Sequence, residues 1–437
     1  MWWLVSIDKS LKETKKGGLR MQRKWAKWFI CFLGTILILS VVAAGCAPSE
    51  PEKPKKDVIK IGFSVPISGW AAVGLETALN PQLMWAERVN AEGGLYIKDL
   101  DQTLPVELVY YDDKSSADEV VKIYERLITQ DKVDLLFGPW GTWASFPLLP
   151  LVEKYKVPLL STTSGTEEIL GVDASYYWAF GALLGKVNGP ELVDFMSANK
   201  AQIGTKVAYM GLIYPAILDF KKAFIPGAQA AGLDIVLEKD YPLGVTDLSE
   251  VLLEVKSLNV DALVVGSITG DMILIIKQAR EIGLDPKFLY FWVGPGVTGF
   301  FDMYADGAAE GITGLSWWDR SGPGPGSAEF FDNYVERWGT TPDMTDVPLH
   351  QAGVQIIEQA IEQAGSLDWE KVNNAIATGE FMTIMGPVRF GDDQVSYTGI
   401  SGTSGSGIAQ AINSEIKLIW PPEYASAEFQ HPKPSWP

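Results

Sequence analysis

Short apolar runs alternate with amphipathic segments over most of the chain. In residues 75–90, Leu79, Leu83, Ala86 and Val89 recur at helical spacing, and two glycines follow as a stop signal. The same spacing predicts helices at 116–129, 144–155, 217–231, 247–258, 271–282, 328–338, 347–364 and 368–377. Strands are predicted at 58–63, 106–110, 135–137, 158–160, 206–210, 234–238, 262–265 and 288–293, with an irregular β-rich segment at 386–420.

Strands that alternate with helices in this way form βαβ units and parallel sheets. The alternation runs once to about residue 160 and restarts near residue 206. The sequence therefore predicts an α/β protein with two doubly wound parallel-sheet lobes. Ligands of such sheets bind outside the carboxyl ends of the strands. A binding site is accordingly expected among the loops 64–74, 138–146, 161–168, 211–216, 266–271 and 293–300.

The first 45 residues have the pattern of an export signal. Arg23, Lys24 and Lys27 precede an uncharged apolar run at 28–42, which is short for a membrane span. Small residues then lead to Cys46, an arrangement that resembles a bacterial lipoprotein signal peptide with Cys46 as the lipidated first residue. An uncleaved N-terminal anchor is the alternative, and Met21 is a candidate for the true start. Residues 46–56 are Pro-rich and charged, so we expect a tether.

Composition excludes several classes of protein. The formal net charge of −18 argues against nucleic-acid binding, which needs clustered Lys and Arg. Two Cys and two His are too few for a zinc ribbon or a disulfide scaffold, and we expect no cofactor and no metal. The unusual number is 16 Trp, because Trp is a frequent wall of ligand sites and interfaces.

Seven short motifs occur in an order and spacing that resemble a known family. The resemblance is to type I periplasmic solute-binding proteins of the leucine/isoleucine/valine-binding class, which serve ABC importers. It implies two lobes joined by a three-strand hinge, with the ligand in the interlobe cleft. It also implies lobe one at 57–180 and 317–385, lobe two at 181–316 and 386–420, and a C-terminal tail at 421–437. The motifs are 67–69 with Gly74, 90–94, 111–113, 137–139, 157–161, 278–280 before Gly283, and 385–390.

The resemblance also implies which loops hold the solute. In lobe one, a solute carboxylate would meet the loop of Ser68, Gly69 and Trp70, the hydroxyl of Thr142, and the loop of Thr163 and Ser164. Hydroxyls and N–H groups that precede helices can bind an anion, although plain helix capping is an equally ordinary role for Ser and Thr. In lobe two, Tyr214 and Thr269 fall at contact positions.

Six tryptophans fall on these loops or on the crossovers, and we expect about half of them to touch the ligand. Such a cleft favours a flat apolar or aromatic solute, or a cation held against π faces. The other reading is that some of them pack the lobe cores. The six are Trp70, Trp140, Trp143, Trp292, Trp317 and Trp318.

One departure from the family concerns the solute's ammonium group. Amino-acid binders of this class often carry an acid where Gly296 stands here. A buried ammonium without a partner is costly. Either Asp271, or another acid such as Asp319, replaces that acid, or the ligand has no amine.

We expect an extracytoplasmic, lipid-anchored, monomeric solute-binding protein that closes on an amino-acid-like or aromatic carboxylate solute and delivers it to an ABC permease. A ligand sensor built on the same fold is the alternative. A secreted hydrolase is a third possibility, but no nucleophile motif accompanies His350 or His431, and packing is the expected role of His350.

Overall fold

The computed structural model describes residues 55–437 except 169–173, 182–183, 323, 392–394 and 397–406. The predicted signal, Cys46 and nearly all of the tether therefore lie outside the described residues. Lys56–Pro437 is one unit, and it holds all the helices and strands discussed below. Within the described part of the chain, no helix has the length and apolar character needed to cross a membrane.

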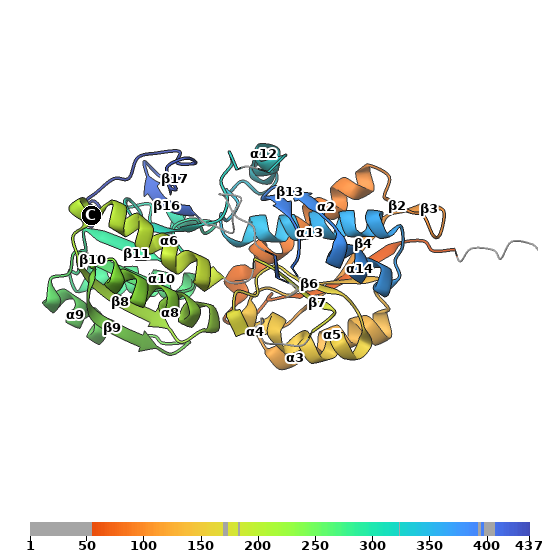
Figure 1. Ribbon diagram of the computed structural model, residues 1–437, viewed down its shortest axis with the longest axis horizontal. Helices are drawn as coiled ribbons and strands as arrows, with labels where there is room; N and C mark the ends of the chain where they lie inside the picture. The colour runs from red at the N-terminus through yellow and green to blue at the C-terminus, as the bar shows by residue number, and fades with distance from the viewer. Residues whose placement is uncertain (1–54, 169–173, 182–183, 323, 392–394, 397–406) are drawn as a thin grey trace, which may run out of the picture. The chain divides into compact units, whose positions relative to one another are not determined.

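The first lobe is built on a six-stranded sheet whose neighbouring strands are all parallel. Figure 1 shows α2 and α13 on one side of this sheet and α3 and α5 on the other. Strand β5 is buried along its whole length because both faces of the sheet are covered. In sheet order the strands are β15 (Val395–Ser396), β7 (Tyr177–Phe180), β6 (Leu159–Ser161), β5 (Leu135–Phe137), β1 (Ile59–Val65) and β4 (Val106–Asp112). The main helices are α2 (Leu75–Ala91), α3 (Ala117–Arg126), α5 (Leu149–Tyr155), α12 (Ser327–Trp338), α13 (Asp346–Ala364) and α14 (Trp369–Thr378).

The second lobe is built on a seven-stranded sheet with five parallel strands and an antiparallel edge formed by the last two strands. In sheet order the strands are β17 (Glu415–Trp420), β16 (Gly407–Ile412), β12 (Thr313–Ser316), β11 (Phe288–Phe291), β10 (Ala262–Gly266), β8 (Lys206–Leu212) and β9 (Asp234–Tyr241). Its main helices are α6 (Leu184–Ala198), α8 (Pro215–Ala230), α9 (Ser249–Leu258) and α10 (Thr269–Glu281).

Helix ends follow local chemistry. The Ser116 hydroxyl accepts the N–H of Glu119 at the start of α3, and Asp368 accepts the N–H of Lys371 at the start of α14. Proline occupies the first position of α8, where its missing N–H costs nothing. These signals explain why the predicted helices and the observed ones agree closely in place.

In the order of the described strands, the chain passes from one sheet to the other three times: after β7, after β12, and between β15 and β16. The last crossing differs from the predicted boundary at residue 386. β15 pairs with β7 of the first sheet, and β14 (Gly386–Val388) pairs with β13 (Phe381–Thr383), which packs on α13. The described residues 386–391 and 395–396 therefore belong with the first lobe. The apolar pattern of a short strand does not reveal which sheet it joins.

Candidate functional site

A cavity of about 300 Å³ lies where loops from both sheets meet. Loops that follow β1, β5 and β6 reach it from the first lobe, and loops that follow β8, β10, β11 and β12 reach it from the second. Parallel strands end at one edge of their sheet, so the loops that follow them converge. Other described residues of the cavity wall come from the start of α13 and from α2. The lining residues are Trp70, Val73, Gly74, Thr77, Trp140, Gly141, Thr142, Thr163, Gly165, Tyr214, Ala216, Ile268, Thr269, Gly270, Ile273, Trp292, Val293, Val297, Thr298, Gly299, Met303, Leu315, Trp317, Asp343, Thr345 and Asp346.

Aromatic side chains form much of the cavity wall: Trp70, Trp140, Tyr214, Trp292 and Trp317. Trp70 is 43% exposed and its indole N–H donates to the carbonyl of Ser115 at 3.2 Å. Trp140 lies against Gly74, where a Cβ would come within 2.6 Å of the indole ring. Only glycine permits that approach. The wall is suited to a flat apolar group, and the indole faces can also attract a cation.

Two threonine hydroxyls brace the loops after β5 and β6. Thr142 Oγ1 accepts the N–H of Gly165 at 3.0 Å, and Thr163 Oγ1 accepts the N–H of Gly141 at 2.7 Å. A hydroxyl that accepts one hydrogen bond still has its own O–H to donate. Both threonines line the cavity, so both can donate to an oxygen of a bound solute.

Contacts made by Tyr214 and Asp219 join the lobes beside the cavity. The Tyr214 hydroxyl, from the second lobe, accepts the N–H of Trp143 at 3.4 Å. Burial raises the pKa of Tyr214 to about 12, so its phenol is protonated at neutral pH and can donate. On α8, the Asp219 carboxylate accepts from the Thr166 hydroxyl at 2.9 Å and from the N–H of Glu167 at 2.8 Å.

Two carboxylates, Asp343 and Asp346, line the cavity at the start of α13. Asp343 Oδ1 accepts three hydrogen bonds, from the N–H and hydroxyl of Thr345 and from the N–H of Asp346, at 2.5–2.7 Å. Asp346 Oδ2 accepts the indole N–H of Trp140 at 2.9 Å. Burial, together with the charge of Asp343, raises the pKa of Asp346 to about 7. Burial also raises the pKa of Asp343.

The acids that the sequence offered in place of Gly296 lie elsewhere. Asp271 faces the Tyr241 hydroxyl at 3.4 Å, and burial raises its pKa to about 6. Asp319 accepts from the N–H of Ser321. Gly296 itself accepts the N–H of Met344 at 2.9 Å. The segment that carries the cavity's two acids is therefore packed directly against the position where the family's acid was expected.

Besides Trp317, seven of the residues singled out from the sequence as possible ligand contacts line this one cavity. Their convergence was expected from strand order, because each follows a strand or starts the next helix. They are Trp70, Trp140, Thr142, Thr163, Tyr214, Thr269 and Trp292.

Ser68 and Gly69 have a different place, since they hold the loop after β1 to the loop after β4. The Ser68 hydroxyl donates to Asp112 at 2.7 Å. Gly69 has φ of 93°, and a Cβ there would lie 2.7 Å from the carbonyl of Lys114. Both residues shape the turn that presents Trp70.

Trp143 and Ser164 lie behind the cavity wall. The Trp143 ring is tilted against that of Trp70, with centroids 5.4 Å apart. Ser164 is completely buried in the first lobe, where it faces the phenol of Tyr177. Each supports a lining residue or the lobe core rather than the cavity surface.

Trp318 was expected to contact the ligand, and this prediction was wrong because its side chain points away from the cavity. Trp318 is completely buried, donates to the Ser327 hydroxyl at 3.1 Å and packs against Phe330 of α12. Its neighbour Trp317 lines the cavity instead. Consecutive residues of an extended segment point to opposite sides, and the sequence does not show which of the two faces the cleft.

Sequence reasoning missed Asp343, Thr345 and Asp346. An acid just before a helix and another in its first turn are the ordinary pattern of helix capping. A usable signal was the position of this helix, which begins after the second crossover and so near the cleft.

His350 lies within α13, completely buried, with Nδ1 3.0 Å from the Thr162 hydroxyl. Burial lowers its pKa to about 3, so it is neutral at physiological pH. This placement agrees with a packing role.

The buried His350 should make the protein sensitive to acid. In the unfolded chain its pKa is about 6.5. Its contribution to stability is therefore complete above pH 6.5 and is lost as the pH falls toward 3, at a cost of about 2 kcal/mol by pH 5. Asp346 and Asp271 act in the opposite direction, because their pKa values are raised.

For this reason, the measurement compares urea unfolding of wild type and His350→Gln at pH 7 and pH 5. Between pH 7 and pH 5, the free energy of unfolding of the variant should fall by about 2 kcal/mol less than that of wild type. Equal losses in the two proteins would contradict the neutral, buried histidine.

Comparisons with known proteins agree with this geometry. The family model described as periplasmic binding protein matches residues 58–398. A Leu/Ile/Val-binding protein homolog 7 from Brucella suis is 23% identical over 361 residues, which cover 78% of this chain and 85% of the relative.

Solved structures share the fold. The branched-chain amino acid transporter substrate-binding protein LivJ from Streptococcus pneumoniae, in complex with isoleucine, aligns with a TM-score of 0.70 at 20% identity, covering 86% of this chain and all of that one. A solute-binding protein from R. palustris, in complex with benzoate, aligns with a TM-score of 0.70 at 17% identity, covering 87% of this chain and 97% of that one. With two parallel-sheet lobes, a cavity between them and a family match over most of its length, the chain belongs to the periplasmic binding protein family.

Proposed function

We propose that this protein is an extracytoplasmic, lipid-anchored solute-binding protein that captures a small solute with a carboxylate and an apolar part, and delivers it to an ABC importer. The observation that carries the proposal is the cavity that both lobes line. A solute held there contacts both lobes at once, so binding favours closure of one lobe on the other. Lipid attachment at Cys46 is the part of the proposal that rests on sequence alone.

The cavity wall offers groups that suit both parts of such a solute. The Thr142 and Thr163 hydroxyls and the Tyr214 phenol are donors that a carboxylate can accept from. The indoles of Trp70 and Trp292 offer an apolar surface to the rest of the molecule. The relatives support this solute class: one is named for leucine, isoleucine and valine, one structure holds isoleucine and another holds benzoate.

The proposal is tested by titrating the purified body, residues 56–437, with isoleucine, leucine, phenylalanine, 3-methylpentanoate and benzoate. Calorimetry and tryptophan fluorescence should both report binding of at least one of these carboxylates, because four indoles line the cavity. A saturating solute should also raise the melting temperature, since it binds only the folded protein. If none of the five binds, solute capture of this class is contradicted.

Thr142→Val should lower the affinity for the best solute by about 30-fold. The substitution removes one donor to the carboxylate and leaves the Gly165 N–H without its acceptor. The matched control is Thr378→Val, because Thr378 is exposed on α14, is not among the residues that line the cavity, and its hydroxyl donates to the carbonyl of Asn374. Equal affinities in the two variants would show that Thr142 does not hold the solute.

A further inference from the structure

The charges on the cavity wall are unbalanced. Among the described residues that line it, Asp343 and Asp346 are acidic and none is Lys, Arg or His. A solute that carries only a carboxylate would add a negative charge beside these two acids. A buried charge is stable only when it has a partner of opposite sign.

The two acids differ in how well they are satisfied. The Asp343 carboxylate is held by three donors of its own turn and positions the start of α13. The Asp346 carboxylate has the indole N–H of Trp140 as its hydrogen-bond donor among the described residues. A carboxylate can accept about four hydrogen bonds, so Asp346 has capacity left for a donor inside the cavity.

A second observation indicates that this cavity receives a polar solute. Trp292 is 5% exposed on the same wall, and its indole N–H has no hydrogen-bond partner among the described residues. Buried N–H groups are rarely left unpaired, so an acceptor atom of a solute is expected there. The cavity thus combines unused donors, on Trp292 and the threonine hydroxyls, with an unused acceptor on Asp346.

We propose that the Asp343–Asp346 pair at the start of α13 is a cation subsite that selects solutes with a positively charged nitrogen. Asp346 contacts that nitrogen, and Asp343 is a positioning residue that fixes the turn and adds negative charge. The N-terminal end of α13 favours the ionised pair when the cation is present. The subsite rests on the proposed function and narrows it, because simple carboxylates such as benzoate lack the group that it binds.

The subsite makes binding depend on pH in a defined direction. Asp346 must be ionised to hold a cation, and burial together with the charge of Asp343 raises its pKa to about 7. Among the described residues, the phenol of Tyr214 interacts with Asp346 and that of Tyr334 with Asp343. Burial raises the pKa of both phenols, so neither ionises near neutrality. Affinity for an amine-bearing solute should therefore rise about tenfold per pH unit below 7 and level off above it.

The test uses matched solutes with and without the amine: isoleucine against 3-methylpentanoate, and phenylalanine against 3-phenylpropanoate. Calorimetry at pH 8 should show that the amine-bearing member of a pair binds at least about 30-fold more tightly. Asp346→Asn should lower that affinity by about 100-fold and remove its dependence on pH, while Asp346→Glu should restore part of both.

Two further variants separate the subsite from a structural role. Asp319→Asn removes an acid of the same crossover that lies outside the cavity, and should bind like wild type. Asp343→Asn keeps an acceptor for the turn but removes the like charge, so the pH midpoint for binding should fall below that of wild type. A melting temperature equal to that of wild type would show that Asp346→Asn is folded.

The outcomes are distinct. If 3-methylpentanoate or 3-phenylpropanoate binds wild type as tightly as its amine-bearing partner, or if Asp346→Asn leaves affinity and its pH dependence unchanged, the cation subsite is overturned and solute capture stands. If no solute of either kind binds wild type, the proposed function itself is contradicted and the subsite falls with it.

Discussion

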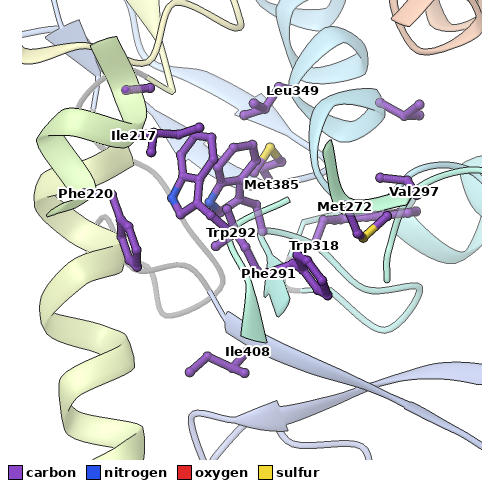
Figure 2. Packing of buried hydrophobic residues seen from close by; sticks show 14 of the residues in the cluster. Ile217, Phe220, Met272, Phe291, Trp292, Val297, Trp318, Leu349, Met385 and Ile408 are labelled. Carbon is purple, nitrogen blue, oxygen red and sulfur yellow. The ribbon is translucent and has the colours of Figure 1, made fainter. Parts of the chain in front are cut away.

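Replacing Phe220 with alanine is expected to lower the free energy of unfolding by about 4 kcal/mol. Phe220 is completely buried on α8 and its ring lies within 6.5 Å, centroid to centroid, of four other aromatic rings. Its ring is stacked on Phe224 at 5.5 Å. Figure 2 shows it near Trp292, which lines the cavity. Removal of the ring leaves a space that rigid aromatic neighbours cannot fill, so both the transfer energy and the packing energy are lost.

Urea unfolding, followed by tryptophan fluorescence and circular dichroism, measures this loss. The control is Leu253→Ala on α9, where the side chain is 51% exposed and the expected change is within about 0.5 kcal/mol. A loss below about 1.5 kcal/mol for Phe220→Ala would show that the aromatic cluster collapses into the space. Affinity for the solute should fall as well, because Trp292 loses its support.

Gly314→Ala is expected to destabilise the fold by about 3 kcal/mol. A Cβ on Gly314 would lie 2.8 Å from the carbonyl of Phe291 and closer still to the Cα of Gly294. Both neighbours are backbone, so relief of the clash requires β11 and β12 to move apart. The segments that follow these strands carry Val293 and Trp317, and the cavity wall would be distorted with them.

The matched glycine substitution is Gly270→Ala in the first turn of α10. A Cβ there would meet no atom within 4 Å, and alanine is the better helix former, so stability should stay the same or rise slightly. Differential scanning calorimetry of the two variants and wild type makes the comparison. Equal melting temperatures for Gly314→Ala and Gly270→Ala would refute the close backbone approach.

The sequence predicted the parallel lobes well because buried strands such as β5 and β10 are uninterrupted apolar runs between helices of clear periodicity. It missed α6, whose interior contains Gly185, Gly189 and Pro190. Glycine and proline normally interrupt helices. Here the glycines serve packing, since a Cβ on Gly189 would lie 2.7 Å from that of Ala223 on α8. The packing of α6 against α8 outweighed the tendency of glycine and proline to interrupt a helix.

The candidate site was predictable to the level of loops. Strand order places the residues after β5 and β6 at one edge of the first sheet and the residue after β8 at the equivalent edge of the second sheet. Thr142, Thr163 and Tyr214 converge because these two edges face the same cavity. The acids of α13 were not predictable, since their spacing is that of a helix cap and their position depends on how the second crossover returns. Trp317 and Trp318 are neighbours in an extended segment, so their side chains point to opposite sides. The segment is too short for its apolar pattern to show which of the two faces the cavity.

The Asp219 contact with Thr166 and Glu167 has a consequence for selectivity. It joins the two lobes without using a residue of the cavity wall, so in the proposed closure it would add the same free energy around every solute. A contribution to the binding free energy that is the same for all solutes cancels when two affinities are compared. This contact therefore sets how tightly the protein holds whatever it captures, while discrimination among solutes rests with the cavity. The two properties can change independently in related proteins.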